Sequence, residues 1–308
     1  MIEDGEESEE STLRSTCAII LNWKDTRGTT LCIQSLLELF DAANIVVVDN
    51  ESTGELKATV EQRFPVGIVV IDNKENRGFA AGVNLGIRFA MAAGYRYVLA
   101  LNNDVVFERR EILPLFDSAR WSGDLGLIAP VIRNLDGSVQ SAGSMVSAST
   151  MSVTEISEVG TLVRPDFLTW ACVLVRVSVF DAVGLLDERF FMYWEDVDFG
   201  LRCRRAGYDH AVVQDASIRH TRSASHTMAG GRIDRYQALS TVVMARKYGS
   251  KWIAGSVLRL GARLIKRVAA RRLGDVVQVG IGAWQGLFMK GPAYLVLAQD
   301  NRSRPRKY

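Results

Sequence analysis

Three carboxylates in this chain stand directly behind an aromatic run. Residues 190–194 contain four aromatic side chains, Glu195 and Asp196 follow at once, and Asp198 comes two residues later. Burying an unpaired carboxylate beside apolar groups is costly, and such surroundings shift its pKa. Side chains with shifted pKa values commonly serve as general acids or bases. The cluster is therefore a candidate for proton transfer.

A fourth carboxylate, Asp104, follows a different apolar run. Residues 97–101 predict a buried strand, and Asn102 and Asn103 separate this strand from Asp104. In open α/β sheets, ligands bind beyond the carboxyl ends of the strands. A carboxylate at this edge, together with a distant acidic cluster, indicates a metal-assisted group transfer that uses a separate base.

The elements that must position these side chains alternate between strand and helix. Short β-branched runs predict strands, and apolar residues at helical spacing predict the helices between them. The predicted strands are 17–22, 44–49, 67–71 and 97–101, and the predicted helices are 28–40, 55–64 and 76–93. This rhythm predicts an α/β fold with a Rossmann-like, mostly parallel central sheet flanked by helices.

Beyond Asp104 the pattern loosens. Residues 141–159 are poor in large apolar groups and predict a mobile loop. Strands are predicted at 167–175, 211–215 and 218–220, and helices at 111–119, from the acidic cluster to Arg205, and from Tyr236 to near Ala298.

Charge sets the two ends of the chain apart. Residues 3–10 are acidic and contain serine, which predicts a disordered tail over residues 1–14. Basic residues crowd the last sixty or so positions, where Asp275 and Asp300 are the only acids. We therefore expect a catalytic domain over residues 15–249 and a basic amphipathic helical segment over residues 250–308.

The composition is that of a globular protein, with 48% hydrophobic and 23% charged residues and a net charge of +2. This near-neutral charge gives no indication of a nucleic-acid partner. The cysteines are scattered without a CxxC pair, which indicates reduced thiols and no zinc site. The sequence shows neither a signal peptide nor an apolar run long enough to span a bilayer. We expect a cytoplasmic protein.

Five segments in a fixed order carry a resemblance to a known family. Each is weak alone, but their order and spacing together are specific. The segments are residues 17–23, 46–53, 76–82, 101–104 and 184–198, followed by His220. From Ser15 to Gly249 the chain resembles family 2 glycosyltransferases, and within them the rhamnosyltransferase-like branch.

The resemblance implies a GT-A fold, a nucleotide-sugar donor and inversion at the anomeric carbon. It implies that Asp49 bonds to the pyrimidine base of the donor, and that Asn22 and Asn50 lie beside the nucleoside. Arg77 and Gly78 then belong to a loop near the ribose and the diphosphate.

The same resemblance assigns a metal and a base. It places Asp104 at the last position of a DxD metal motif, His220 where relatives supply a further metal ligand, and Asp196 at the catalytic base. The first position of the motif is Asn102 rather than Asp, and we group Asn102 and Asn103 with the donor-binding residues. One charge fewer should weaken the binding of the expected divalent cation, Mg²⁺ or Mn²⁺.

The predicted reaction accounts for these residue types. A nucleoside diphosphate leaves with developing negative charge, which a divalent cation neutralises, and inversion needs a base on the opposite face of the sugar. Glu195 is expected to position either the acceptor or the base, and Trp194 is a candidate for contact with the acceptor. Structural interpretations stand beside these, because helix dipoles favour acids in a first turn. Asp198 is spaced to pair with Arg202.

We therefore predict an inverting transfer of a sugar to a glycan or lipid-linked acceptor in cell-surface polysaccharide synthesis. Rhamnose from dTDP-rhamnose is the most specific donor that the resemblance implies. One alternative is a catalytically silent sugar-nucleotide or glycan-binding module of the same fold. The other is a nucleotidyltransferase, although residues 22–27 lack the Gly-rich phosphate loop that such an enzyme ordinarily has.

The segment after residue 250 mixes leucines with arginines. This basic amphipathic pattern suits a helix that lies on the anionic, cytosolic face of a membrane. The alternative is a helix packed on the catalytic domain with a solvated basic face. Lipid-linked acceptors, which the resemblance implies, favour the peripheral membrane contact. The cations of the pattern are Arg259, Arg263, Lys266, Arg267, Arg271 and Arg272.

Overall fold

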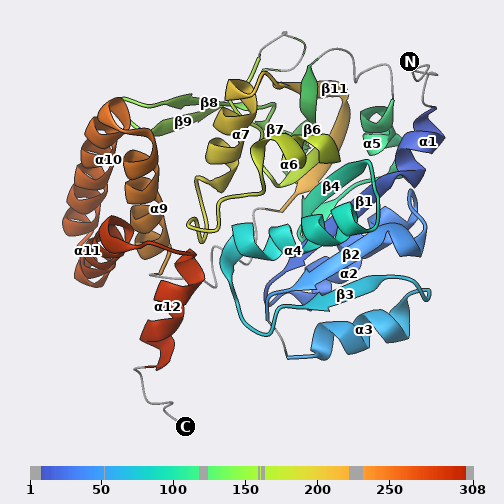
Figure 1. Ribbon diagram of the computed structural model, residues 1–308, viewed down its shortest axis with the longest axis horizontal. Helices are drawn as coiled ribbons and strands as arrows, with labels where there is room; N and C mark the ends of the chain where they lie inside the picture. The colour runs from blue at the N-terminus through green and yellow to red at the C-terminus, as the bar shows by residue number, and fades with distance from the viewer. Residues whose placement is uncertain are drawn as a thin grey trace.

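The computed structural model describes residues 8–51, 53–117, 124–158, 160, 164–221 and 232–302, with residues 298–302 described by their backbone alone. A mixed sheet runs through the middle of the described chain, and helices cover both of its faces (Figure 1). The predicted α/β fold, with its C-terminal helical appendage, is confirmed.

The central sheet follows the order β3-β2-β1-β4-β10-β6-β11-β5, with β7 paired to β6. Strands β1 to β4 run parallel, whereas β10 pairs antiparallel with both β4 and β6. The strands are β1 Thr16–Asn22, β2 Ile45–Asp49, β3 Val69–Asp72, β4 Tyr97–Asn102, β5 Val105–Val106, β6 Leu125–Arg133, β7 Val139–Ser141, β10 Cys172–Arg176 and β11 Asp209–His220.

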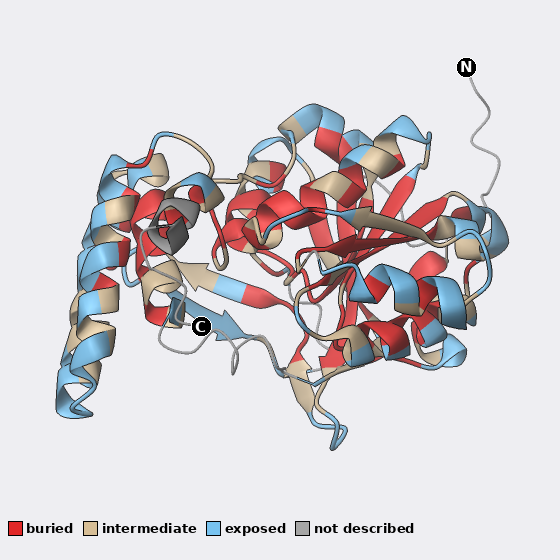
Figure 2. Cartoon of the chain, turned by 90° about the horizontal axis from the view of Figure 1, so that it is seen from below, coloured by how far each residue is buried: buried red, intermediate tan, exposed pale blue. Residues whose placement is uncertain are grey.

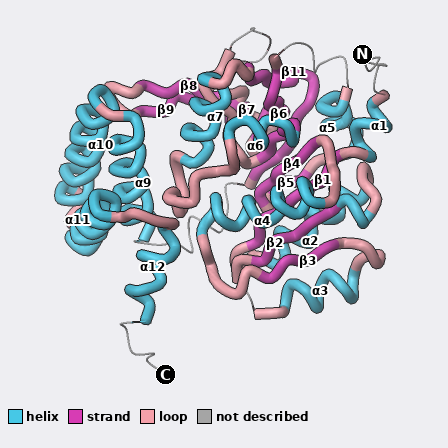
Figure 3. The backbone as a smooth tube through the Cα atoms, in the orientation of Figure 1, coloured by secondary structure: helices cyan, strands magenta, loops and turns pink. Residues whose placement is uncertain are grey.

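Helices connect these strands and then continue as a separate group at the C-terminal end (Figure 3). The α-helices are α1 Glu9–Arg14, α2 Thr26–Leu37, α3 Glu55–Arg63, α4 Gly78–Ala92, α5 Arg109–Ile112, α6 Val177–Val183, α7 Glu195–Arg205, α9 Arg232–Tyr248, α10 Ser250–Ala269, α11 Leu273–Phe288 and α12 Ala293–Arg302.

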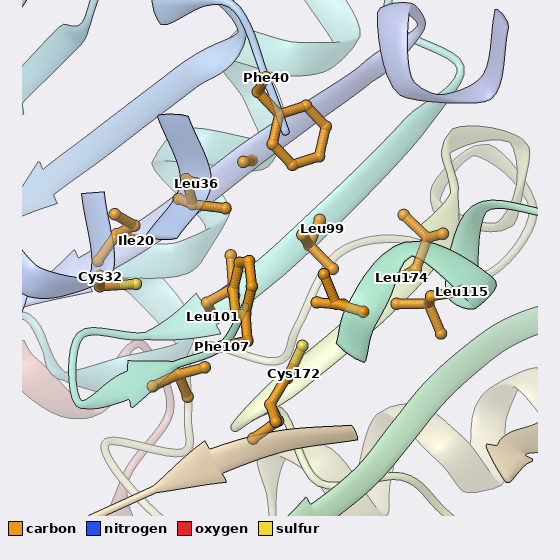
Figure 4. Close-up of a cluster of buried hydrophobic side chains, with 14 of the residues drawn as sticks. Ile20, Cys32, Leu36, Phe40, Leu99, Leu101, Phe107, Leu115, Cys172 and Leu174 are labelled. Carbon is orange, nitrogen blue, oxygen red and sulfur yellow. The ribbon is translucent and has the colours of Figure 1, made fainter. Parts of the chain in front are cut away.

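The sheet is buried on both faces because neighbouring residues of its central strands enter different apolar cores. Ile20 and Leu99 pack on one face with Cys32 and Leu36 of α2 (Figure 4). Ile19 packs on the other face with side chains from α4, α6 and α7. Figure 2 shows the resulting buried interior around the strands. Nearly continuous apolar strands are typical of a parallel sheet that is covered on both sides.

The register of the parallel strands brings their carboxyl ends to one edge. Asn22 of β1 pairs with Asp49 of β2, and Leu21 pairs with Asn102 of β4. Asp49 in turn pairs with Asp72 of β3. The polar residues that end these strands therefore meet at the edge where α/β proteins bind ligands.

Two segments differ from the prediction. Residues 9–14, expected in a disordered tail, form α1, because Ser8 caps its first turn and Leu13 is buried. Residues 1–7 of that tail lie outside the described residues. The expected loop at 141–159 contains a hairpin of β8 Ser144–Ser147 and β9 Ser152–Glu155. Strand β9 is exposed along its length, so its sequence lacks the apolar alternation that reveals a half-buried strand.

Other boundaries shift in ways that follow from local geometry. The strand expected at 167–175 begins at Cys172, since Phe167 makes only an isolated bridge with Ser144. The two strands expected at 211–215 and 218–220 are one strand, β11, with irregular register between Val213 and Ser217. The helix expected at 111–119 is α5 followed by a 3₁₀ turn at Leu113–Phe116, and residues 118–123 are outside the described chain.

A buried carboxylate joins the sheet domain to the C-terminal helices. Asp198 of α7 is fully buried, and its carboxylate accepts from Arg202 Nε at 2.9 Å, which confirms the predicted pair. The same carboxylate accepts from Tyr248 Oη at 2.8 Å and lies 2.7 Å from Lys247 Nζ, both on α9. A buried acid needs such partners, so α7 and α9 hold each other in place.

Helices α9, α10 and α11 lie together at one end of the molecule (Figure 1). The division at residue 249 stays a prediction, but α9, which precedes it, packs with the two helices that follow it. Part of the expected basic face points inward, because Arg263 and Arg267 of α10 pair with the buried Asp234 of α9.

Candidate active site

A cavity of about 740 Å³ opens at the carboxyl edge of the sheet. Its walls come from segments far apart in the sequence: the ends of β1 and β4, the start of α4, the hairpin β8–β9, the turn before α7, and α10. Of the predicted site residues, those that line the cavity are Asn50, Gly78, Asn102, Asn103, Asp104, Trp194, Glu195, Asp196 and His220.

Two predicted donor-binding residues lie behind the cavity wall and contact each other. Asn22 donates from Nδ2 to Asp49 Oδ1 at 2.9 Å and accepts from Thr29 Oγ1 at 2.8 Å. Asn103 donates to Thr29 Oγ1 at 3.2 Å and so extends this network to the cavity. Both Asn22 and Asp49 are buried. Asn22 therefore orients Asp49, and the assignment of both to the nucleoside stays a prediction.

Asn50 fixes the loop in which α4 begins. Its Nδ2 donates to the Gly78 carbonyl at 3.0 Å, and its Oδ1 accepts from Asn73. Arg77, by contrast, is not among the residues that line the cavity. Its guanidinium lies 5.1 Å from the centre of the Tyr294 ring, and its Nε is 3.6 Å from Glu75. The structure thus places the Arg77 side chain against α12 and Glu75.

Gly78 allows α4 to touch the segment that leads to α7. Its φ is +84°, and a Cβ at this position would stand 2.3 Å from the Phe191 carbonyl oxygen. The next residue, Phe79, donates its backbone N–H to that same oxygen at 2.7 Å. Only glycine tolerates both the positive φ and the close approach. This contact joins the sheet edge to the acidic cluster.

Asp104 and His220 come together although 116 positions separate them in the sequence. Asp104 Oδ1 lies 3.1 Å from His220 Nε2, and Asn102 Nδ2 lies 3.3 Å from the same nitrogen. The other ring nitrogen, Nδ1, is 3.1 Å from Gln140 Oε1. If Nδ1 carries the proton that Gln140 accepts, the Nε2 lone pair faces the Asp104 carboxylate. A metal-binding histidine is typically oriented by such a partner at its other nitrogen.

Few side chains at this point can serve as metal ligands. Within the described residues, no group of three or more His, Cys, Asp or Glu side chains is gathered as a metal site. Asp104 and His220 offer one carboxylate and one imidazole. A cation held here would need further oxygen ligands from a substrate or from water, as Mg²⁺ usually does. The two residues therefore suit a cation that is bound together with a diphosphate.

The acidic cluster enters the cavity on an unusual backbone. Tyr193 and Trp194 have φ values of 71° and 73°, a left-handed conformation that non-glycine residues rarely adopt. Helix α7 starts at the next residue, and its first turn presents Glu195 and Asp196 to the cavity. Consecutive residues of this kind persist only where the surroundings hold them, and they concentrate at functional sites.

Burial raises the pKa of both acids that face the cavity. Burial, and then the charge of Asp196, raise the pKa of Glu195 to about 8. Burial and the nearby Glu155 raise the pKa of Asp196 to about 6. Glu195 Oε2 is buried and has no hydrogen-bond partner among the residues that the structure describes. Both carboxyl groups therefore hold their protons to a higher pH than ordinary acids do, as expected for two acids that share one buried site, and such pairs can divide acid and base roles.

Sequence reasoning missed four polar residues of the cavity. They are Gln140, Glu155, Gln237 and Arg259. Gln140 lies in β7, just before the region predicted as a loop, whereas Glu155 lies within that region, and no motif marks either residue. The other two come from the C-terminal helices, where the pattern indicates only amphipathicity. Arg259 in particular belongs to the cations that we expected on a membrane-facing surface, but it lines the cavity instead.

Comparison with known proteins identifies the family of this chain. Residues 29–183 match the sequence profile described as Glycosyl transferase family 2. The chain is also 30% identical over 274 residues to the N-acetylglucosaminyl-diphospho-decaprenol L-rhamnosyltransferase of Mycobacterium tuberculosis, a match that covers 74% of this chain and 85% of that one. The chain belongs to glycosyl transferase family 2.

Other relatives of this family 2 glycosyltransferase act in glycan synthesis. Over 216 residues it is 29% identical to a hexosyltransferase of low-salt glycan biosynthesis from Haloferax volcanii, and the match covers 68% of each chain. Family membership agrees with the predicted transferase and gives the nucleotidyltransferase alternative no support.

Solved structures confirm the GT-A fold of the family 2 glycosyltransferase. A mannosyltransferase from Pyrobaculum calidifontis, solved with GDP-Man and Mn²⁺, superposes with a TM-score of 0.54 at 15% identity, covering 97% of this chain and 82% of that one. GalNAc-T7, solved with UDP, GalNAc and Mn²⁺, gives a TM-score of 0.56 at 13% identity, covering 83% of this chain and 54% of that one.

The raised pKa of Glu195 predicts a pH-dependent gain in stability for Glu195→Gln. Between the ordinary value of 4.5 and about 8, folded Glu195 holds a proton that the unfolded chain has lost, so wild-type stability falls as pH rises through this window. Glutamine stays neutral, so the variant does not lose stability in this way as the pH rises. The difference in unfolding free energy should grow across the window by at least about 1.4 kcal/mol and then level off.

Chemical denaturation of both proteins across this pH range measures the difference. Glu61→Gln, at an exposed position of α3, is the control and should show no such trend. A constant difference between Glu195→Gln and wild type across the window would contradict the raised pKa.

Proposed function

We propose that this glycosyltransferase moves a sugar from a nucleotide donor to an acceptor hydroxyl with inversion, and that Asp196 is the general base. One observation carries the proposal: a single cavity is lined both by the strand-end residues Asn102 and Asp104 and by Asp196. Inversion needs this arrangement, because the base and the leaving group act on opposite faces of the sugar.

The donor occupies the sheet edge in this proposal. Asp49 and Asn50 hold the nucleoside, with Asn22 orienting Asp49 through their hydrogen bond. The diphosphate lies near Asn102 and Asp104, where the strands end. L-Rhamnose is the proposed sugar and dTDP-rhamnose the proposed donor, which the name of the mycobacterial relative supports for the sugar.

Asp104 and His220 are the proposed ligands of a divalent cation, Mg²⁺ or Mn²⁺. Their carboxylate and imidazole fit Mn²⁺ well, and Gln140 orients the imidazole. When bound, the cation would neutralise the charge that develops on the departing diphosphate. Both structural relatives were solved with Mn²⁺. Asn102 in place of an acid predicts weaker cation binding than a site with two carboxylates.

Asp196 takes the proton of the acceptor hydroxyl. Its pKa of about 6 leaves it ionised at neutral pH yet more basic than an ordinary aspartate. Glu195, which keeps its proton, avoids a second charge beside this base and can donate a hydrogen bond to the acceptor. Trp194, which precedes them, lines the acceptor side of the cavity.

The acceptor is proposed to be lipid-linked, and α10 and α11 are proposed to lie on the membrane that contains it. No helix in the described part of the chain is long and apolar enough to cross a bilayer. Exposed apolar side chains nevertheless cover both helices, among them Ile265 at 72%, Trp284 at 65% and Phe288 at 61% exposure. Exposed cations accompany them, and these are Lys251, Lys266, Arg271, Arg272 and Lys290. Such a surface suits an anionic interface.

Asp196→Asn should abolish transfer while donor binding survives. Asparagine keeps the shape of the side chain but cannot accept the proton, so turnover should fall by at least about 100-fold. Donor affinity, measured by calorimetry, should stay within about twofold of wild type, because the base lies away from the nucleotide.

Asp181→Asn, at an exposed position of α6, serves as the matched control and should behave as wild type in both assays. An equal loss of transfer and of donor affinity in Asp196→Asn would remove Asp196 from the role of base.

If α10 and α11 lie on a membrane, the full-length protein should sediment with anionic vesicles at low salt. Replacing Trp284 and Phe288 together by serine should weaken this binding at least about tenfold, because each apolar side chain that enters the interface contributes about 1.5–3 kcal/mol. The two rings contact each other, with centroids 4.4 Å apart. Leu135→Ser, which alters an exposed loop residue, should change nothing. The proposed membrane contact of α10 and α11 would be refuted if wild type did not bind vesicles, or if the double change left binding unaffected.

A further inference from the structure

Three arginines repeat at four-residue spacing along α10, and one of them differs from the other two. Arg263 and Arg267 pair with the buried Asp234 of α9, at 2.5 and 2.9 Å. Arg259, one turn earlier, pairs with no acid in the described part of the chain. Arg259 is instead one of the residues that line the cavity.

The contacts of Arg259 are all with neutral groups. Its Nη1 donates to the Met151 carbonyl at 2.6 Å, and its Nη2 donates to Gln237 Oε1 at 3.3 Å. Its guanidinium carbon lies 5.1 Å from the centre of the Trp194 ring. These contacts orient the side chain, but two carbonyl oxygens and an indole do not neutralise a full positive charge.

The position of Arg259 makes that charge costly. The residue is partly buried, and burial, followed by the repulsion of Arg263, lowers its pKa. An arginine still keeps its proton under such conditions. Its unpaired charge therefore remains, together with the free-energy cost of burying it. Neutral hydrogen-bond acceptors do not require a permanent cation, whereas a bound anion does. An anionic ligand would offset the cost and accept the remaining N–H groups in a bidentate manner.

The same charge is distinctive within the cavity. Among the described residues that line it, Arg259 is the one lysine or arginine, and the acids Asp104, Glu155, Glu195 and Asp196 line it as well. The ring below the guanidinium belongs to Trp194, which directly precedes the two acids of α7. An anion on Arg259 would therefore lie beside Trp194, the residue that leads into the proposed base.

We propose that Arg259 is the anchor for an anionic phosphate ester carried by the acceptor. This inference rests on the proposed function, because it takes the Asp196 side of the cavity as the acceptor side. Arg259 binds the phosphate oxygens through its planar fork, with Trp194 stacked beneath it, and so places an acceptor hydroxyl near Asp196. Arg259 is a positioning residue that discriminates phosphorylated acceptors from neutral glycans.

The test compares two ligands that differ only in the phosphate. N-Acetylglucosamine 1-phosphate and N-acetylglucosamine are titrated by calorimetry into the full-length protein in EDTA, so that no metal contributes. Wild type should prefer the phosphorylated sugar by at least about tenfold, the size of one charge-assisted interaction. Arg259→Gln should lose this preference. Arg259→Lys, which keeps the charge without the fork, should retain part of it.

Controls separate this role from a structural one. Lys57→Gln removes an exposed cation from α3 and should leave the preference unchanged. Titration of dTDP into each variant reports on the donor side, and Arg259→Gln should bind it as wild type does. If Arg259→Gln does not fold, the preference of wild type itself and its partial retention in Arg259→Lys still decide the matter.

Several outcomes would overturn the inference. Equal affinity of wild type for the two sugars would do so, as would an unchanged preference in Arg259→Gln. A loss of dTDP binding in Arg259→Gln would assign the arginine to the donor phosphates instead. The titration needs no turnover, so a protein that bound the phosphorylated sugar through Arg259 yet transferred no sugar would refute the proposed function alone.

Discussion

The contact between Gly78 and the Phe191 carbonyl is the constraint on which the active-site cavity depends. It joins the start of α4, at the edge of the parallel sheet, to the segment that leads into α7. Asn84 of α4 strengthens this junction, because its side chain donates to the Leu186 carbonyl and accepts from the Leu186 N–H. Asn50 supports this junction from the sheet side, since its side chain binds the Gly78 carbonyl. Ser240 of α9 supports it from the other side by donating to the Met192 carbonyl at 2.9 Å.

These supports account for the strained turn at Tyr193 and Trp194. Each left-handed residue costs of order 1–3 kcal/mol, and the surrounding contacts must supply that energy. Phe190, Phe191 and Trp194 are buried in one apolar cluster with side chains of α9 and α10. The buried Asp198, bound by Arg202, Tyr248 and Lys247, anchors the helix that follows. The acids of α7 therefore divide into one that holds the helix and two that face the cavity.

The sequence predicts the first four strands well because they are short, apolar and β-branched. It does not give the order of the strands, nor the antiparallel β10 between β4 and β6. It also predicts the pairing of Asp198 with Arg202, which depends only on helical spacing. The proximity of Asp104 and His220 could be expected only through the family resemblance, because it depends on β11 lying beside β5. Local patterns do not encode such long-range pairing.

Two errors show where local patterns fail. The hairpin at residues 144–155 is held by cross-strand bonds and a packed Phe167, so its own sequence looks like a loop. The arginines of α10 share one face because they are four residues apart, but periodicity does not say whether that face meets water or protein. Asp234, on the preceding helix, draws Arg263 and Arg267 inward, and α10 thereby carries Arg259 to the cavity.

The most direct test of the central claim is a donor screen with the full-length protein. A panel of nucleotide sugars is incubated with Mg²⁺ or Mn²⁺, released nucleoside diphosphate is detected, and binding of each donor is followed by calorimetry. The account predicts that one donor binds and is slowly hydrolysed, and that hydrolysis is lost in EDTA and in Asp104→Ala. A protein that binds no nucleotide sugar of the panel, with or without metal, would contradict it.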